Sequence, residues 1–405
     1  MCKVAVIGYG VVGSGTVELF MKNRESISKK VGKECDIKYI LDLRDFPDSP
    51  FADKMIKDFN IILNDAEVEV VAEVVGGTTF AYDYTKKLLE HGKSVVTSNK
   101  ALVAEKGAEL LKIAREHNCN YLFEASVGGG IPIIRPLNKC LAGNEILQIS
   151  GILNGTTNFI LTKMIEDGMT FEAALKLAQD NGYAEKDPTA DIEGFDACRK
   201  VCILASLAFG KHVYPNQVEA EGITNITLED VSYISSVGGV IKLLGQIKYI
   251  NDDKIAAFVS PAVVFHGSQL ASVNGVFNAI LVRGDAVGDV CFYGQGAGKL
   301  ATASAVVADM VDSAVHVERR INFGWSAGNE DYVVDEKATI EMPFYVRAKS
   351  SESKVKALLN DVKFLTRVGQ PSDEVAFITD SMTQYELNEK LKDVEVINII
   401  KVTNY

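Results

Sequence analysis

The chain has 405 residues, of which 47% are hydrophobic and 24% charged, the composition of a folded protein with more than one domain. Its 42 basic and 54 acidic residues give a formal net charge of −12, which argues against nucleic acid or an anionic membrane as a partner. No apolar run approaches the roughly 20 residues of a membrane span, and the N-terminus lacks the pattern of a secretory signal.

Seven cysteines are scattered along the chain. An odd, dispersed set indicates reduced thiols in a cytoplasmic protein rather than a disulfide framework. Cys198 and Cys202 lie four apart on a predicted helix with no histidine nearby. This pair therefore favours buried packing over a metal site.

The first third of the chain alternates strands with helices. An apolar strand at residues 3–7 leads through a glycine turn into a helix over 11–22. Further apolar runs, separated by helical patterns, follow at residues 37–41, 68–77, 94–99 and 121–130. Such a pattern predicts a parallel sheet covered on both faces. We therefore expect an α/β fold whose Rossmann-type doubly wound sheet forms a dinucleotide-binding domain from residues 1–130 and about 295–325.

Residues 131–294 show a different pattern. Long apolar strands alternate with predicted helices around 170–181 and 191–209, which indicates a second, α+β domain with a largely antiparallel sheet. A glycine turn at 294–298 then opens a helix of small residues. The final segment, 340–405, follows the order strand, helix, strand, strand, helix, strand, which predicts a small ferredoxin-like domain.

The glycine turn Gly8-Tyr-Gly10-Val-Val-Gly13 joins the first strand to the first helix. A lone G-x-G-x-x-G pattern is weak, but between a strand and a helix it predicts a dinucleotide site. Gly8 permits the tight turn, Gly10 lets a pyrophosphate approach the backbone, and Gly13 lets the helix close on the strand. The pyrophosphate then lies at the helix N-terminus, where free N–H groups favour anions.

The end of the second strand carries both Asp42 and Arg44. An acid at this position binds the ribose of NAD, whereas an arginine accommodates the 2′-phosphate of NADP. The sequence favours neither residue over the other. The predicted cofactor is therefore NADP or NAD.

Residues 182–200, GYAEKDPTADIEGFDACRK, concentrate charge in an otherwise apolar region. Asp196 and Lys200 lie four apart and so share one face of a predicted helix. They form either a surface salt bridge or, because this helix is apolar almost all round, a buried pair suited to proton transfer. Glu185 could receive an ammonium group. The cluster predicts hydride transfer to or from a small polar substrate, with the dinucleotide carrying the hydride.

The chain resembles the homoserine dehydrogenases, specifically the monofunctional bacterial type with a C-terminal ACT-like domain. The resemblance covers residues 3 to about 315. It is carried by GYGVVG (8–13), VVTSNKALVA (95–104), FEASVGGGIPII (123–134), GILNGTTNFIL (151–161), the cluster at 182–200 and GQGAGKLATASAV (294–306). Another amino-acid dehydrogenase of the same architecture is the alternative, and a non-enzymatic regulatory protein is a more distant one.

This resemblance implies an NAD(P)-dependent oxidoreductase that interconverts L-homoserine and L-aspartate 4-semialdehyde during threonine, methionine and isoleucine synthesis. It implies that Lys200 donates the proton, that Asp196 orients Lys200, and that Lys100 contacts both cofactor and substrate. The implied substrate-binding residues are Glu185, Asp191, Thr156 and Lys100. The implied cofactor-binding residues are Gly8, Gly10, Val11, Val12, Gly13, Asp42, Arg44, Gly76, Ser98, Lys100 and Gly296.

The resemblance also implies a monovalent cation, expected to be sodium, and an assembly of subunits. The implied cation ligands are backbone carbonyls of Glu124, Val127, Gly129 and Ile131; a glycine-rich domain hinge explains that turn equally well. Domain 131–294 is expected to dimerise, giving a homodimer or homotetramer. The tail departs from the family, because KSSESKV (349–355) replaces the usual Asp-x-Pro-Gly turn of ACT domains. We expect the tail to pair subunits without binding threonine.

Overall fold

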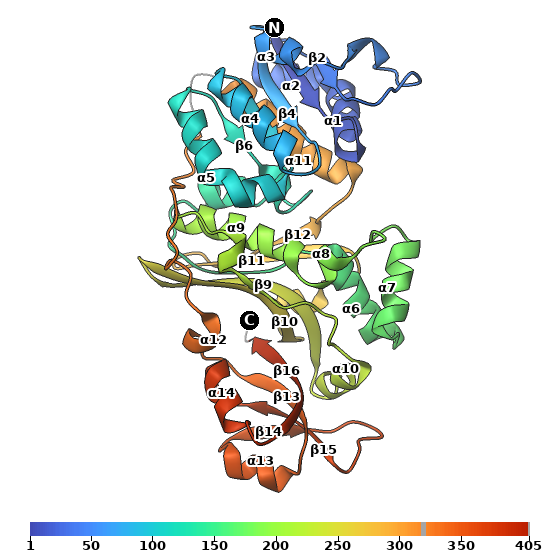
Figure 1. The fold of residues 1–405 in the computed structure, drawn as a ribbon, viewed down its shortest axis with the longest axis vertical. Helices are drawn as coiled ribbons and strands as arrows, with labels where there is room; N and C mark the ends of the chain where they lie inside the picture. Colours follow the sequence, from blue (N-terminus) through green and yellow to red (C-terminus); the bar gives the residue numbers. More distant parts are fainter. Residues whose placement is uncertain (317–320, 404–405) are drawn as a thin grey trace. The chain divides into compact units, whose positions relative to one another are not determined.

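The computed structural model describes residues 1–316 and 321–403 (Figure 1). Residues 317–320 and 404–405, which belong to the predicted segments 295–325 and 340–405, lie outside the described residues. The chain divides into two compact units. The first comprises residues 1–144, 202–215 and 294–329, and the second comprises 145–201, 216–293 and 330–405. The predicted domain boundaries near residues 130, 294 and 340 stay predictions.

A six-stranded sheet forms the centre of the first unit, in the order β3-β2-β1-β4-β5-β6. Its strands are β1 (Cys2–Ile7), β2 (Cys35–Leu41), β3 (Met55–Ile56), β4 (Val68–Glu73), β5 (Ser94–Thr97) and β6 (Tyr121–Leu122). All neighbouring strands pair in parallel. This is the strand order of dinucleotide-binding folds. The predicted Rossmann-type sheet is therefore confirmed.

Helices cover this sheet. They are α1 (Val11–Lys22), α2 (Arg24–Val31), α3 (Phe59–Asn64), α4 (Thr79–Glu90), α5 (Lys100–Glu116) and α11 (Lys299–Val315). The late helix α11 returns to lie beside α1 (Figure 1), and Lys299 Nζ pairs with Glu18 Oε1 at 2.7 Å. Every residue of β1 except Lys3 is buried, as expected for a strand packed on both faces.

The predicted run 121–130 forms less strand than its apolar residues indicate. Strand β6 ends at Leu122, and the chain turns into a 3₁₀ helix, η2 (Glu124–Ser126). The other short 3₁₀ or π turns are η1 (Ala52–Lys54), η3 (Pro136–Cys140), η4 (Pro215–Gln217) and η5 (Gln269–Ser272). The glycine-rich stretch after η2 is a turn that packs against the segment containing Gly296. Its residues are therefore apolar because they are buried and not because they pair in a sheet.

The second unit is built on a mixed sheet with the order β12-β11-β7-β9-β10-β16-β13-β15-β14, and β8 pairs with β10. Its first strands are β7 (Ile146–Ile152), β8 (Glu219–Ala220), β9 (Gly239–Asn251), β10 (Lys254–Phe265), β11 (Phe277–Gly284) and β12 (Gly288–Gln295). Strands β7, β9, β10 and β11 pair antiparallel, as predicted. Its helices are α6 (Gly155–Asp167), α7 (Phe171–Asp180), α8 (Thr189–Ile192), α10 (Leu228–Ser235) and α12 (Glu336–Thr339). Helix α9 (Phe195–Phe209) begins in this unit and belongs to the first unit from Cys202 onward.

The C-terminal segment has the predicted element order. It consists of β13 (Phe344–Lys349), α13 (Glu352–Leu358), β14 (Val362–Leu365), β15 (Glu374–Thr379), α14 (Gln384–Lys390) and β16 (Glu395–Thr403). Strand β16 pairs in parallel with β10 through Ala262 and Lys401, so the tail continues the second sheet. The apolar core of the tail also includes Ala256 and Phe258 of β10.

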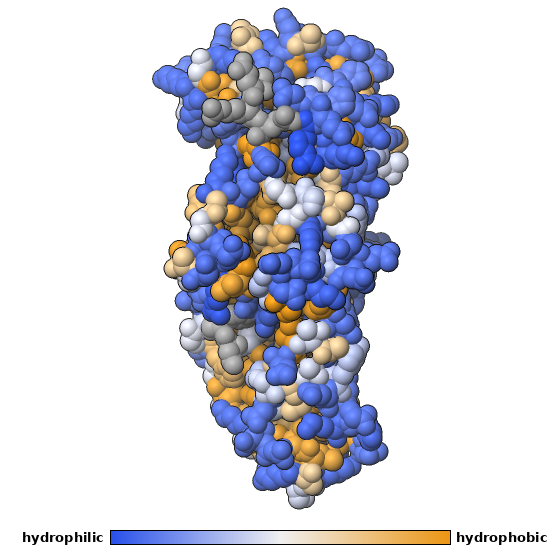
Figure 2. All heavy atoms as spheres, turned by 90° about the vertical axis from the view of Figure 1, so that its left-hand side faces the viewer, coloured by the Kyte–Doolittle hydropathy of each residue, from blue (hydrophilic) through white to orange (hydrophobic). Residues whose placement is uncertain are grey.

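The face shown in Figure 2 is mostly hydrophilic, with hydrophobic residues gathered in places between the hydrophilic ones. Such a mixed surface is usual for a chain with many acidic and basic residues. No helix in the described part of the chain is long and apolar enough to cross a membrane.

Candidate active site

The glycine turn after β1 has the geometry that brings a helix N-terminus close to a strand end. Gly8 has φ +95°, a conformation that favours glycine, and its N–H donates to the Leu41 carbonyl at 2.8 Å. A Cβ at Gly13 would collide with the Gly8 carbonyl oxygen. Helix α1 begins directly after Gly10, and Val11 in its first turn is exposed. The first N–H groups of α1 are thus available to an anion.

A hollow of about 560 Å³ lies beside this turn. Its lining residues come from the turn, the loop after β2 and the start of α11, and include Tyr9, Gly10, Val11, Phe46 and Lys299. Pockets that bind small molecules and cofactors have volumes of about 300 to 1,000 Å³. The hollow beside the helix end is thus large enough to hold part of a dinucleotide.

Asp42 and Arg44 bind each other at the end of β2. Arg44 donates from Nε to Asp42 Oδ1 at 3.0 Å and from Nη2 to Asp42 Oδ2 at 2.9 Å. The Tyr9 N–H also donates to Asp42 Oδ2, at 2.7 Å. The Arg44 guanidinium holds the pKa of Asp42 well below its usual range. Arg44 is mostly exposed, whereas the Asp42 side chain is largely buried beneath it.

Three further predicted cofactor residues lie at the carboxyl ends of neighbouring strands. Gly76 follows β4, with open space where its side chain would be. Ser98 follows β5, and Lys100 is the first residue of α5. Asn99 caps this helix, because its Oδ1 accepts the Leu102 N–H at 3.1 Å. Ligands of doubly wound folds bind at this edge of the sheet.

The turn at 124–131 is organised by the carboxylate of Glu124. This buried group accepts three backbone N–H bonds, from Ile133 at 2.7 Å, Ile134 at 2.8 Å and Arg135 at 2.9 Å. A Cβ at Gly129 would collide with the Gly296 carbonyl oxygen. The structure thus brings together two predicted residues, Gly129 and Gly296, that the sequence did not connect.

In the second unit, Asp196 and Lys200 form the buried alternative of the predicted pair. Lys200 Nζ lies 2.7 Å from Asp196 Oδ2, and the exposed fractions of Lys200 and Asp196 are only 7% and 5%. Lys200 also donates to the Leu153 carbonyl at 2.6 Å. A buried pair that shares a backbone acceptor holds the ammonium group in one place, unlike a flexible surface salt bridge.

Sequence reasoning missed Asn154, the first asparagine of NGTTN. Its Nδ2 donates to Asp191 Oδ1 at 2.7 Å and to Asp196 Oδ2 at 3.0 Å, while its Oδ1 accepts the Thr157 N–H and caps α6. The position was readable as a helix cap from its residue type. The two carboxylate partners were not, because they lie 37 and 42 residues away in the chain.

Two further predicted substrate residues, Thr156 and Glu185, lie near this group in the chain. The Thr156 hydroxyl donates to the Tyr183 carbonyl at 2.6 Å, which ties the start of α6 to the 182–188 loop. Glu185 in that loop has an exposed side chain, while its backbone carbonyl accepts from Gln179 Nε2 at 3.2 Å. An exposed carboxylate is available to an incoming ammonium group.

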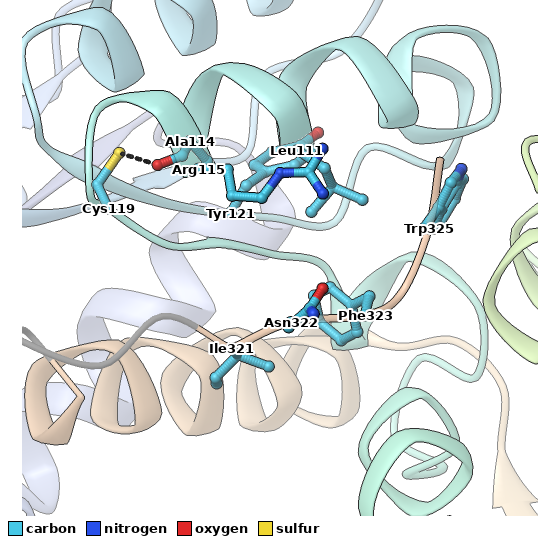
Figure 3. Close-up of a pocket in the computed structure, with 9 residues that line it drawn as sticks. All are labelled: Leu111, Ala114, Arg115, Cys119, Tyr121, Ile321, Asn322, Phe323 and Trp325. Atoms are coloured by element: carbon cyan, nitrogen blue, oxygen red, sulfur yellow. Dashed lines mark hydrogen bonds between the residues drawn. The ribbon is translucent and has the colours of Figure 1, made fainter. Parts of the chain in front are cut away.

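A separate small cavity lies under α5 (Figure 3). Its volume is about 40 Å³, and its lining includes Arg115, Tyr121 and Trp325 but none of the predicted site residues. Such a volume holds a water molecule or two and no dinucleotide. Groups of three or more His, Cys, Asp or Glu side chains that could hold a metal ion do not occur among the described residues.

A dinucleotide-binding sheet and a buried lysine–carboxylate pair define an NAD(P)-dependent oxidoreductase. Family profiles match both parts: "Homoserine dehydrogenase, NAD binding domain" at residues 8–124 and "Homoserine dehydrogenase" at 132–311. The chain is 42% identical to the homoserine dehydrogenase of Bacillus subtilis over 313 residues, covering 76% of this chain and 72% of that protein. It belongs to the homoserine dehydrogenase family and has that activity.

Solved structures agree. A homoserine dehydrogenase from Thiobacillus denitrificans matches with a TM-score of 0.89 at 32% identity, over 100% of this chain and 98% of that one. The Staphylococcus aureus enzyme matches with a TM-score of 0.82 at 34% identity, over 100% and 99%. A hyperthermophilic archaeal homoserine dehydrogenase mutant, in complex with NADPH, matches with a TM-score of 0.66 at 28% identity, over 78% and 98%.

Proposed function

We propose that Lys200 transfers the proton in the interconversion of L-homoserine and L-aspartate 4-semialdehyde. The observation that carries this proposal is the buried contact of 2.7 Å between Lys200 Nζ and Asp196 Oδ2. In the direction of reduction, the Lys200 ammonium donates a proton to the aldehyde oxygen; in the direction of oxidation, the neutral Lys200 amine receives the proton of the hydroxyl. When bound, the nicotinamide supplies or accepts the hydride.

Asp196 orients Lys200 in this proposal. Its Oδ2 accepts from both Lys200 and Asn154, which holds the carboxylate in place. The Leu153 carbonyl accepts a second hydrogen bond from Lys200. These acceptors aim the lysine and stabilise its charged form, which is the form that acts as an acid.

Carboxylates of the same region bind the substrate. Glu185 receives the amino group, and Asp191, whose carboxylate accepts from Asn154, is a second carboxylate that contacts the substrate. The Thr156 hydroxyl donates to the Tyr183 carbonyl. Its oxygen can therefore act only as an acceptor, and it accepts a hydrogen bond from the substrate. Lys100 contacts both cofactor and substrate.

The glycine turn supports binding of the dinucleotide by Gly8, Gly10, Val11, Val12 and Gly13, with Gly76, Ser98 and Gly296 as further contacts. Asp42 selects NAD or Arg44 selects NADP. Replacing each with Ala separates these alternatives, because loss of the 2′-phosphate contact weakens NADP alone. The dissociation constants of both dinucleotides are the readout.

We also propose a monovalent cation at the carbonyls of Glu124, Val127, Gly129 and Ile131. The Glu124 carboxylate is occupied by three N–H groups, which leaves backbone oxygens as the ligands that this turn offers.

We further propose that the C-terminal βαββαβ segment is an ACT-like domain that pairs subunits in a homodimer or homotetramer. Measuring the mass of the protein in solution tests this proposal.

The reaction itself is tested by adding L-homoserine and NAD or NADP to the purified protein. We expect reduced dinucleotide to form with L-homoserine and not with L-serine or L-threonine. Formation with another amino acid alone would favour a different amino-acid dehydrogenase.

A further inference from the structure

Glu73, the last residue of β4, carries a carboxylate that the proposed reaction does not use. Its side chain is fully buried, as are its neighbours Ala72 in the same strand and Val96 in β5. Burial raises the pKa of Glu73 to about 7. A buried carboxyl group costs stability unless its oxygens are hydrogen-bonded. The two buried oxygens of Glu73 therefore need hydrogen-bond donors.

The two oxygens of Glu73 join the ends of two adjacent strands. Oε1 accepts the Val75 N–H at 2.8 Å, and Oε2 accepts the Thr97 hydroxyl at 2.8 Å. Val75 follows β4, whereas Thr97 is the last residue of β5. In its ionised form the carboxylate accepts through both oxygens, whereas a glutamine amide offers only one accepting oxygen.

The bonds continue from Thr97 to Asn99. Thr97 Oγ1 accepts the Asn99 N–H at 2.9 Å. The Asn99 side chain then donates to the Gly77 carbonyl at 2.6 Å, which returns the connection to the loop after β4. The same side chain caps α5 through the Leu102 N–H. Glu73, Thr97 and Asn99 thus close a ring of hydrogen bonds around the loop after β4 and the start of α5.

We propose that Glu73 is a positioning residue for the cofactor site: through Thr97 and Asn99 it fixes the 75–78 loop and the first turn of α5, which begins with Lys100. This inference rests on the proposed function of Gly76 and Lys100. Both lie within or next to the ring in the chain, yet neither belongs to it. The ring fixes their backbone before any ligand arrives.

The test removes one hydroxyl and restores it. Thr97→Val keeps the shape of the side chain but leaves a Glu73 oxygen and the Asn99 N–H without a partner, whereas Thr97→Ser keeps the hydroxyl. Thr85→Val is the matched control, because Thr85 is equally buried in the same unit and its hydroxyl has no partner among the described residues. The dissociation constant of NADPH and NADH, kcat, KM and thermal unfolding are measured for each variant.

We expect Thr97→Val to weaken dinucleotide binding and lower kcat by about tenfold each, the order of effect expected when buried polar groups lose their partner. The KM for homoserine should change much less, Thr97→Ser should recover most of the loss, and Thr85→Val should match the wild type. Glu73→Gln combined with Thr97→Val should be no worse than the more affected single variant, because both interrupt one ring.

Wild-type binding and kinetics in Thr97→Val would overturn the inference. So would a loss in Thr97→Val that Thr97→Ser shares, or one explained entirely by a smaller folded fraction. Dinucleotide binding is measured without the substrate. A failure of the proposed proton transfer by Lys200 would therefore leave this binding measurement, and the test of this inference, unaffected.

Discussion

The side-chain amide of Asn154 donates to Asp196 Oδ2 at 3.0 Å and to Asp191 Oδ1 at 2.7 Å, so one asparagine holds two carboxylates of the charged cluster. Its Oδ1 at the same time caps α6. The residue therefore has two separable roles. One is local and serves the helix, and the other is long-range and serves the proposed site.

Replacing Asn154 separates these roles. Asn154→Ser retains a capping oxygen but removes the amide donor, whereas Asn154→Ala removes both. We expect both variants to lose roughly tenfold or more in kcat/KM, since charged acceptors lose a donor, and only Asn154→Ala to lose about 1 kcal/mol in the free energy of unfolding. Equal activity of Asn154→Ser and wild type would remove the amide from the site.

Lys200→Ala should abolish turnover and leave dinucleotide binding nearly unchanged. Loss of a positioned acid–base group costs about 10²–10⁴ in rate. Lys163→Ala is the matched control, because Lys163 pairs with Asp167 at the same i,i+4 spacing on an exposed helix face. Steady-state kinetics and NADPH titration give the comparison, and near-normal turnover in Lys200→Ala would exclude Lys200 from proton transfer.

Glu185→Gln should raise the KM for homoserine strongly and change dinucleotide binding little, because the variant loses the charge that pairs with the substrate amino group. Glu172→Gln, another exposed carboxylate in the neighbouring helix α7, is the control. Initial rates over a range of homoserine concentrations decide the point. An unchanged KM in Glu185→Gln would refute the ammonium assignment.

His212 makes the stability of the first unit depend on pH. Its Nδ1 accepts the Trp325 Nε1–H at 3.0 Å, and burial lowers the pKa of His212 to about 4. The folded state thus favours the neutral ring. Its contribution is fully present above the unfolded pKa of about 6.5 and is lost as pH falls from there towards 4, by roughly 3 kcal/mol in all.

Trp325 is the only tryptophan, so its fluorescence reports unfolding near His212 directly. Denaturant titrations at pH 7, 6 and 5 should show a smaller free energy of unfolding at each step. His212→Gln should be less stable at neutral pH and show a weaker pH dependence over this interval. An identical pH profile in wild type and variant would contradict the assignment.

The tail should give no threonine sensitivity. KSSESKV has no glycine or proline in the turn after β13, and Ser351 instead caps α13 by accepting the Lys354 N–H at 3.3 Å. Adding L-threonine to the full-length protein should leave its rate unchanged; strong inhibition would restore a regulatory role.

Deleting residues 341–405 should lower thermal stability, because the deletion removes β16, the partner strand of β10, and exposes Phe258.

The sequence by itself determined the local structure and the class of chemistry. The apolar pattern predicted helix α1 over residues 11–22, the observed Val11–Lys22. The spacing of Gly8 and Gly13 indicated the tight turn, and the four-residue spacing of Asp196 and Lys200 put both on one helix face. These features depend on residues a few positions apart, because steric limits on the backbone and the periodicity of helices and strands act over short stretches of sequence.

Only the tertiary structure decided which distant groups meet. The pattern at 121–130 indicated a long strand, but the chain turns after Leu122 because Glu124 binds three N–H groups beyond it. The contact of Asn154 with two carboxylates and the pairing of β16 with β10 likewise join segments far apart in sequence. The tertiary structure also decides that the Asp196–Lys200 pair is buried. Hydrogen-bond partners of buried polar groups are set by this packing, and residue type alone specifies the need for a partner without specifying which one.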